Sequence, residues 1–229
     1  MHKLFITGTD TDAGKTFVAT TLLYKAQSLG LSTFGLKPIA AGCEWSLEQN
    51  PSGEWHNDDA LSLQAASSIK TDYAVNNPVA FPQAVAPHIA AELNNSQLTL
   101  NSLLEQCQTG MEQVAGLHLI EGAGGWLVPL NNEHTLADFA QQLNHDVVLV
   151  VGMKLGCINH ALLTQQLILA TKLNFVGWVA NHIDPEMSEQ EANFAYLKNH
   201  LQAPCLGRIP FSPIKQPKDL IHHIILPSE

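Results

Sequence analysis

Runs of apolar residues alternate with segments of helical period along most of this chain. The five consecutive apolar residues at 147–151 are typical of a strand that is buried on both faces. Five further apolar runs predict strands, and the segments between them carry helical spacing. The pattern predicts strands at residues 3–7, 32–37, 117–121, 147–151, 175–180 and 205–209, and helices at residues 16–28, 58–66, 98–116, 136–143, 159–172 and 188–201.

Alternating strands and helices predict an α/β fold, with a parallel β-sheet flanked by helices on both faces, because parallel strands need crossover connections. A length of 229 residues suits one such domain, and no shift in composition marks a boundary. We therefore expect a single α/β domain over residues 1–229. The polar stretch at 43–57, which contains Gly and Pro, predicts one long loop.

The segment from Gly8 to Thr16 indicates a function. It follows the first predicted strand and ends in Gly14, Lys15 and Thr16, where the first predicted helix begins. The N–H groups of such a loop face an anion, the lysine reaches the β- and γ-phosphates, and the threonine hydroxyl ligates Mg²⁺. Five residues separate the two glycines, one more than in the usual template. The segment predicts a nucleoside triphosphate site and, with the fold, a P-loop NTPase architecture.

Composition narrows the class of protein. The 45% hydrophobic and 14% charged residues are typical of a globular protein, and the net charge of −10 argues against a nucleic-acid-binding surface. The four cysteines are widely spaced, which favours reduced core thiols over disulfides or a zinc site. We find no signal peptide and no apolar run of about 18 residues. We therefore expect a cytoplasmic protein without nucleic-acid or membrane partners.

Polar groups follow the predicted strands at the points where the strands end. In parallel sheets, ligands bind at the carboxyl ends of the strands, so we expect these groups to crowd one edge beside the phosphate loop. Carboxylates suit a hard cation there, and amines suit phosphate oxygens. The groups are Lys37, Asp58, Asp59, Glu121 with the glycines that follow it, residues 154–159, Asn181 and His182.

Several motifs occur in a recognisable order. They are GTDT at 8–11, GKT at 14–16, GLKP at 35–38, NDDAL at 57–61, PH at 87–88, EGAGG at 121–125, KLGCINH at 154–160 and GWVAN at 177–181. In this order the chain resembles the dethiobiotin synthetase family, from residue 3 to about residue 212. The resemblance implies a homodimeric ligase of biotin synthesis that depends on ATP and Mg²⁺. Such a ligase joins CO₂ to 7,8-diaminononanoate and releases ADP and phosphate.

The resemblance also implies a role for each matching residue. Lys15 and Lys37 flank a substrate carbamate and the γ-phosphate as catalytic residues, and Thr16, Asp59 and Glu121 hold Mg²⁺. The implied ATP-binding residues are Asp12, Ala13, Gly14, Lys15, Thr16, Phe17, Asp59, Glu121, Gly122, Ala123, Gly124, Asn181, His182, Pro210, Phe211 and Ser212. The implied substrate-binding residues are Thr11, Lys37, Ala41, Gly156, Cys157, Ile158 and Asn159.

Residues 156–159 open a predicted helix, whose free N–H groups form an anion site. The resemblance implies that this site takes the substrate carboxylate of the neighbouring subunit, although simple helix capping would produce the same pattern. Cys157 lies at this helix N-terminus, where a thiol pKa tends to fall. Because ring closure needs no nucleophilic thiol, we expect Cys157 to act only as a backbone donor.

Three positions depart from the family pattern. Ala41 stands where a serine is common in the family, and it lacks the hydroxyl that could form a hydrogen bond to the substrate worth about 0.5–1.5 kcal/mol. His182 and Phe211 replace an aspartate and a tryptophan of the base pocket, in which Asn181 offers adenine both a donor and an acceptor. The sequence predicts nucleotide binding and leaves the choice of base open.

Simpler roles are open for two of the polar sites. Lys37 could be an exposed lysine at a strand end. Asn57, Asp58 and Asp59 can each cap or begin the second predicted helix, with Asp58 as the cap if Asp59 ligates the metal.

The main competing class is the P-loop ATPase switch of the partitioning or septum-placement type, which shares the architecture. Those proteins typically add a lysine early in the phosphate loop, and a membrane helix or a basic DNA-binding surface. Here residues 9–13 contain no lysine, and the apolar stretch at 220–226 is too short and too weakly amphipathic for an anchor. An ATP-dependent amide ligase for corrinoid carboxylates usually carries a glutaminase domain, for which 229 residues leave no room.

Overall fold

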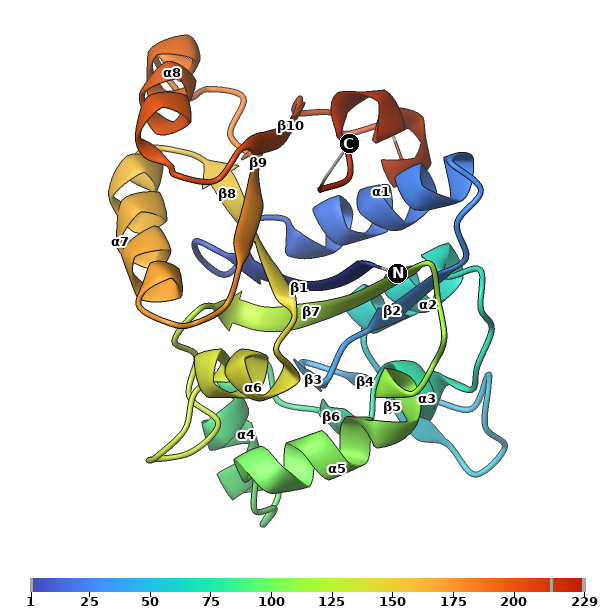
Figure 1. The fold of residues 1–229 in the computed structure, drawn as a ribbon. Coiled ribbons are helices and arrows are strands. Elements are labelled where there is room, and N and C mark those ends of the chain that lie inside the picture. The colour runs from blue at the N-terminus through green and yellow to red at the C-terminus, as the bar shows by residue number, and fades with distance from the viewer. Residues whose placement is uncertain (1, 215, 228–229) are drawn as a thin grey trace.

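A six-stranded parallel sheet forms the centre of the computed structural model, which describes residues 2–214 and 216–227 (Figure 1). Its strand order is β10-β9-β8-β1-β7-β2, and each pairing between neighbours is parallel. All six predicted strands are present. Their bounds are β1 (His2–Gly8), β2 (Thr33–Leu36), β7 (Leu117–Gly125), β8 (Asp146–Met153), β9 (Phe175–His182) and β10 (Cys205–Ile209).

Helices cover both faces of this sheet, as predicted. One face carries α1 (Lys15–Ser28), α2 (Asp58–Ala66) and the 3₁₀ helix η1 (Pro217–His223). The other carries α5 (Leu100–Met111), α6 (Leu136–Leu143), α7 (Cys157–Leu169) and α8 (Gln190–His200). Side chains of a strand alternate between the two cores: Leu4 and Ile6 pack on the α1 side and Phe5 on the other. This two-sided burial is why the strands are apolar throughout.

The stretch at 43–57 is not one long loop, so that prediction was wrong. It contains an antiparallel hairpin of β4 (Glu44–Ser46) and β5 (Glu54–His56), in which Trp45 and Trp55 lie directly opposite each other. Their rings meet edge to face with centroids 5.2 Å apart, a cross-strand contact that stabilises a short ribbon. Gly53 allows the turn, since its φ is +80° and a Cβ there would strike the Trp45 ring.

Besides this hairpin, four short elements between β2 and α5 have no counterpart in the sequence-based assignment. β3 (Ile39–Ala41) pairs in parallel with β6 (Val79–Phe81), and the helix α4 (Pro87–Leu93) packs against both strands. The helix α3 (Tyr73–Asn76) packs against β2, α2 and α5. Elements of three to seven residues are too short for a periodic signal to build up.

Some helix boundaries differ from the predicted ones. The helix predicted at 98–116 begins only at Leu100, because Thr99 caps it and forms a capping box with Ser102. Helix α7 begins at Cys157, two residues earlier than predicted, after Gly156 in a left-handed conformation. The residues after 212 include η1, and Leu220, Ile224 and Leu226 are buried in the core against α1.

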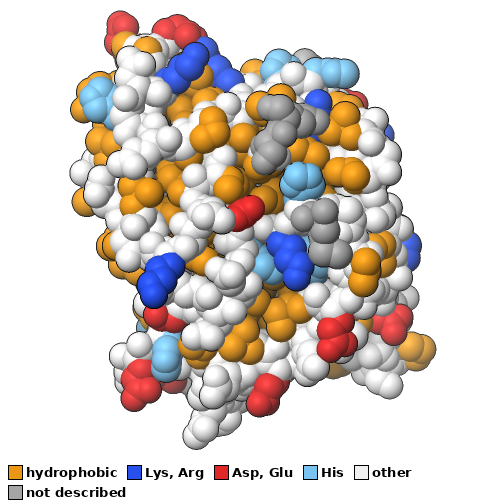
Figure 2. Space-filling model, viewed as in Figure 1, with side chains coloured by type: hydrophobic (Ala, Val, Ile, Leu, Met, Phe, Trp, Pro, Cys, Tyr) orange, Lys and Arg blue, Asp and Glu red, His pale blue; other side chains and the backbone are white. Residues whose placement is uncertain are grey.

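On the face seen in Figure 2, lysine and arginine side chains stand apart from one another. No helix in the described part of the chain has the length and apolar character that a membrane crossing requires. The cysteines are unpaired thiols, and Cys43, Cys107 and Cys157 are buried, as predicted.

Candidate active site

The phosphate loop joins β1 to α1 and is shaped by Gly14. Gly14 has a φ of +82°, and a Cβ there would lie 2.0 Å from Nδ2 of Asn181. Asn181, on β9, donates from that nitrogen to the carbonyl of Ala13 at 3.0 Å. No side chain caps α1 at Gly14, so the first N–H groups of the helix are available to an anion. Asp12 also adopts a positive φ, of 60°. It lies between Gly8 and Gly14, where the loop is one residue longer than in the usual template.

Lys15 begins α1, and its side chain turns back over this loop. The residue is 7% exposed, and its Nζ donates to the carbonyl of Asp10 at 3.3 Å. Burial lowers the pKa of Lys15, and the nearby Lys37 ammonium lowers it further. An anion bound at the loop would offset both effects, which is what a triphosphate supplies.

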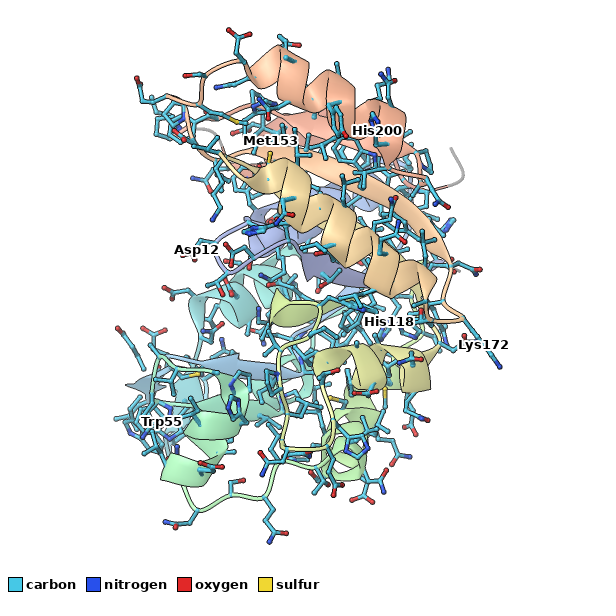
Figure 3. The ribbon with its side chains drawn as sticks, turned by 90° about the vertical axis from the view of Figure 1, so that its left-hand side faces the viewer. Asp12, Trp55, His118, Met153, Lys172 and His200 are labelled. Carbon is cyan, nitrogen blue, oxygen red and sulfur yellow. The ribbon has the colours of Figure 1, made fainter. Side chains whose placement is uncertain are left out.

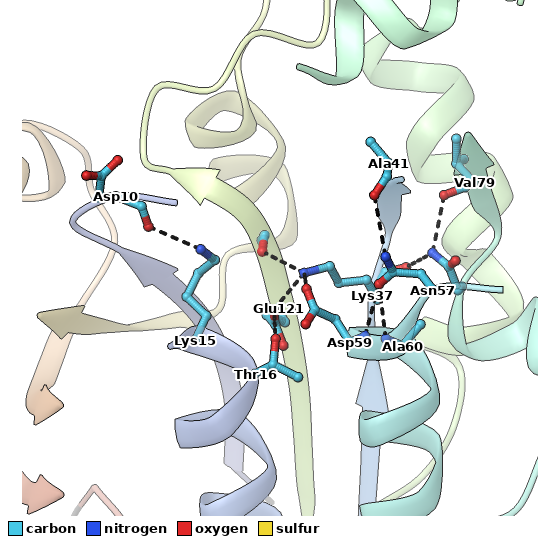
Figure 4. A network of polar contacts seen from close by, with 12 residues as sticks. Asp10, Lys15, Thr16, Lys37, Ala41, Asn57, Asp59, Ala60, Val79 and Glu121 are labelled. Carbon is cyan, nitrogen blue, oxygen red and sulfur yellow. Dashed lines mark hydrogen bonds and ion pairs between the residues drawn. The ribbon is translucent and has the colours of Figure 1, made fainter. Parts of the chain in front are cut away.

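Lys37 lies just beyond the end of β2 and reaches two carboxylates (Figure 4). Its Nζ lies 2.6 Å from Oε1 of Glu121 and 3.1 Å from Oδ2 of Asp59. Lys37 is 3% exposed and Glu121 is fully buried. Burial by itself would lower the pKa of the Lys37 ammonium, but the two carboxylates outweigh it and raise that pKa. The suggestion of an exposed strand-end lysine was therefore wrong.

The side chains of Thr16, Asp59 and Glu121 lie close together beside the Lys37 ammonium. The Thr16 hydroxyl donates to Oε1 of Glu121 at 2.8 Å, so this oxygen accepts from both Thr16 and Lys37. Oε2 of Glu121 is buried and has no hydrogen-bond partner among the described residues. Burial would raise the pKa of Asp59, but Lys37 and Thr16 hold it below its ordinary value.

These three residues fit a magnesium ion. An unpartnered buried carboxylate oxygen needs a cation or a donor, and Mg²⁺ is usually held by one or two carboxylates together with phosphates and waters. Within residues 2–214 and 216–227, no group of three or more His, Cys, Asp or Glu side chains could hold a metal ion. A complete cage of protein ligands is thus absent from that part of the chain. The assignment of these residues as metal ligands stays a prediction.

Asn57, not Asp58, caps α2. Its Oδ1 accepts from the N–H groups of Asp59 at 3.1 Å and Ala60 at 3.3 Å. Asn and Asp are equally good caps, and here the extended conformation of Asn57 places its side chain over the first turn. The cap leaves the Asp59 carboxylate free to face Lys37.

A cavity of about 690 Å³ opens beside these groups. Of the predicted site residues, it is lined by Thr11, Asp12, Gly14, Lys15, Thr16, Phe17, Lys37, Ala41, Asp59, Ala123 and Gly124. Asn57 and an apolar wall that includes Val85, Pro87 and Val128 also line it. The sequence analysis did not assign these to the site, although the Pro-His motif at 87–88 marked part of this wall.

None of the predicted base-binding residues lines this cavity. Asn181 is 5% exposed, and its side-chain amide donates one hydrogen bond to the carbonyl of Ala13. The Nε–H of Arg208 donates to Nε2 of His182 at 2.9 Å, and burial and Arg208 together lower the pKa of His182. Ser212 lines a second cavity of about 760 Å³, next to Thr16, Phe17 and Asp59. Phe211 is 46% exposed, and neither cavity includes Pro210.

The predicted carboxylate site is the N-terminus of α7. Residues 156–159 line neither of these two cavities, but Lys154 just before them pairs with Asp10 of the phosphate loop at 2.9 Å. Cys157 is 1% exposed, and burial raises its pKa, so the expected lowering at a helix N-terminus was wrong. Burial disfavours the thiolate more than the helix N-terminus favours it.

Figure 3 shows that the phosphate loop and the start of β7 lie toward opposite sides of the molecule. Asp12 of the phosphate loop and Trp55 of the hairpin lie toward one side of the molecule, and His118 near the start of β7 lies toward the other. Lys37, just beyond the end of β2, and Glu121, within β7, meet Thr16, which follows the loop after β1. The prediction that these groups crowd this edge is confirmed for Lys37, Asp59 and Glu121.

A family model described as an AAA domain matches residues 2–218. Proteins named ATP-dependent dethiobiotin synthetase BioD are similar over most of their length. The one from Cellvibrio japonicus is 54% identical over 90% of this chain and 88% of its own, and that from Pseudomonas aeruginosa is 45% identical over 99% and 97%.

Solved structures of lower identity share the architecture. The septum site-determining protein MinD from Pyrococcus horikoshii, complexed with Mg-ADP, has a TM-score of 0.53 at 14% identity, over 93% of this chain and 82% of that one. The cell division ATPase MinD from Pyrococcus furiosus has a TM-score of 0.53 at 16% identity, over 93% and 85%. At such identities the similarity shows the fold alone.

Proposed function

This chain belongs to the ATP-dependent dethiobiotin synthetase family, whose members are ATP-dependent ligases, and we propose that it forms dethiobiotin from 7,8-diaminononanoate, CO₂ and ATP. The observation that carries the proposal is the buried Lys37 ammonium, held between Asp59 and Glu121 beside the phosphate loop. It gives the site a second fixed positive charge next to Lys15, where a carbamate and a phosphoryl group would meet. Residues 1–229 act as one domain in this proposal.

The triphosphate end of ATP would bind at the N-terminus of α1. The uncapped N–H groups after Gly14 and the buried Lys15 ammonium support this role. Thr16, Asp59 and Glu121 would hold Mg²⁺, which when bound neutralises charge on the β- and γ-phosphates. The unpartnered Oε2 of Glu121 supports that assignment. The nucleoside would extend toward the second cavity, lined by Phe17 and Ser212.

The bond changes follow from the chemistry of a diamine and CO₂. One amine nitrogen bonds to the carbon of CO₂ and loses a proton, which gives a carbamate. A carbamate oxygen attacks the γ-phosphorus as the bond to ADP breaks, which gives a carbamic-phosphoric anhydride. The second amine then attacks the carbonyl carbon, phosphate leaves with the former carbamate oxygen, and a proton is released as the ring closes.

Lys37 would stabilise the charge that spreads over the carbamate and phosphoryl oxygens during transfer. Its raised pKa keeps the ammonium charged at neutral pH, so it acts as a fixed cation and not as a base. Lys15 would hold the γ-phosphate from the other side. Positioning and electrostatics then supply most of the rate, as in other phosphoryl transfers.

The diamine would occupy the first cavity. Val85, Pro87 and Val128 offer its aliphatic chain an apolar wall, and Thr11 and Ala41 lie on the same cavity. We propose that the distant carboxylate is captured by the N–H groups at 156–159 of a second subunit, because this helix start lines neither cavity of its own chain. The working unit would then be a cytoplasmic homodimer.

Phosphate release tests this function. We expect rapid release only when ATP, Mg²⁺, bicarbonate and diaminononanoate are all present, and background release when any one is omitted. A diamine that lacks the carboxylate should stimulate poorly. Equal stimulation by both diamines would contradict the anion site, and no stimulation by either would contradict the ligase.

A further inference from the structure

The backbone of Lys37 is held on both sides by the segment that follows α2. Its N–H donates to the carbonyl of Asn76 at 2.7 Å, and its carbonyl accepts from Nδ2 of Asn77 at 2.8 Å. Asn76 and Asn77 are 0% and 3% exposed. Lys37 lies beyond the last residue of β2, so these bonds replace the sheet ladder that would otherwise fix its position.

Tyr73 links this segment to the cap of α2. Its hydroxyl accepts from the backbone N–H of Asn57 at 2.8 Å and donates to Oδ1 of Asn77 at 2.8 Å. Tyr73 is 2% exposed, and burial raises its pKa, so the hydroxyl keeps the proton that it donates. The ring packs on His56 with centroids 4.2 Å apart.

A continuous chain of hydrogen bonds therefore runs between the two partners of one ion pair. From Asn57, which caps α2, it reaches Asp59 on one side. Through Tyr73 and Asn77 it reaches the backbone of Lys37 on the other. Figure 4 shows Asn57 between Asp59 and the strand that carries Ala41, whose carbonyl accepts from the Asn57 amide at 3.4 Å.

We propose that Tyr73 is a positioning residue, whose hydroxyl fixes the distance between Lys37 and Asp59 for phosphoryl transfer. The proposal rests on the function proposed above. Tyr73 does not line the cavity, so it would act only through Asn57 and Asn77. Removing a group that hydrogen-bonds to the residues around a metal, without touching the metal itself, commonly lowers activity or metal affinity about 10–100-fold.

Tyr73→Phe tests this role, because it removes one oxygen and keeps the ring against His56. We expect kcat to fall about tenfold and the KM for ATP, measured with Mg²⁺, to rise only severalfold. Tyr196→Phe is the matched control, since Tyr196 is 42% exposed on α8 and stacks on His200. Its kinetic constants should equal those of the unaltered chain.

A second readout does not depend on turnover. Calorimetry gives the ATP dissociation constant with Mg²⁺ and with EDTA, and the ratio of the two reports on the metal site. Tyr73→Phe should raise the dissociation constant with Mg²⁺ severalfold and leave the EDTA value unchanged, so the gain in affinity that Mg²⁺ gives becomes smaller. If the unaltered chain forms no dethiobiotin, the proposed function fails, and this ratio still tests the role of Tyr73.

A merely structural role would give a different result. Tyr73→Phe would then lower the melting temperature but leave kcat and the metal-dependent ratio unchanged at temperatures where the variant is folded, and this would overturn the proposal. A cycle with Asn77→Ala adds a further check on the chain of bonds. If the two residues act through one chain of bonds, the double variant should lose less kcat than the product of the two single losses. A loss equal to that product would contradict the linkage. The Tyr73→Phe comparison stands even if Asn77→Ala does not fold.

Discussion

Nζ of Lys37 lies 2.6 Å from Oε1 of Glu121, although the two residues are 84 positions apart in the chain. One follows β2 and the other lies within β7, which pair in parallel along the central sheet. Both side chains are buried, so the pair is shielded from solvent and its geometry is fixed by the strands. This relationship gives the site a permanent cation beside the phosphate loop.

Lys37→Gln should slow the chemical step and spare ATP binding. The amide keeps much of the length of the side chain but loses the charge that opposes the developing negative charge, which is expected to cost about 10²–10³ in kcat. The ATP dissociation constant should change by less than about threefold. Lys172→Gln, at an exposed lysine beyond α7, is the control. Unchanged turnover at saturating diamine would remove Lys37 from the catalytic residues.

Glu121→Gln should weaken the dependence on Mg²⁺ without loss of the fold. The variant keeps an oxygen that accepts from Thr16 and Lys37 but removes the negative charge at the unpartnered Oε2. The Mg²⁺ concentration for half-maximal turnover should rise about tenfold or more. A titration with Mg²⁺ at fixed ATP measures this, with circular dichroism to check folding. An unchanged titration would contradict the metal assignment.

Gly14→Ala should abolish tight ATP binding. The new Cβ would meet Nδ2 of Asn181 at 2.0 Å and would also hold alanine at a φ of +82°. Gly30→Ala separates the two effects, because Gly30 has the same φ and open space around it. That control should lose about 1–2 kcal/mol of stability but keep its ATP affinity. Equal ATP affinities in the two variants would show that the contact with Asn181 does not shape the loop.

Acid should destabilise the protein through His145. The residue is 6% exposed and packs on the ring of His118, and burial lowers its pKa to about 4. His145 takes up a proton near pH 6.5 in the unfolded chain but only near pH 4 in the folded chain. The free energy of unfolding therefore decreases as the pH is lowered from about 6.5 to about 4. His145 alone should contribute a loss of about 3 kcal/mol by pH 4.

Urea unfolding between pH 7.5 and 4 measures this loss. His145→Asn should flatten the dependence on pH, whereas His222→Asn, at an exposed histidine, should not. A variant at position 145 with the same slope as the unaltered chain would contradict the role of His145.

The sequence was sufficient for the sheet and for the central part of the site, because both follow from simple rules. Strands buried on both faces are continuously apolar, as at 147–151, and parallel topology brings the ends of such strands together. Lys37, Asp59 and Glu121 were therefore expected at one edge, where they lie.

What sequence reasoning missed depends on contacts that composition does not record. The pairing of Trp45 with Trp55 turns a polar stretch into a hairpin. Asn57 and Asp58 have similar capping strength, so only the backbone conformation decides which one caps α2. The bonds of Tyr73 to Asn57 and Asn77 join residues with no shared motif.

The central claim is that the γ-phosphoryl group passes to a carbamate oxygen and not to water. Turnover with ¹⁸O-labelled bicarbonate, followed by mass spectrometry of the released phosphate, tests it most directly. Because phosphate leaves with the former carbamate oxygen, we predict one ¹⁸O atom in each phosphate formed together with dethiobiotin. Unlabelled phosphate, released at the same rate without the diamine, would identify a hydrolytic ATPase and contradict the ligase.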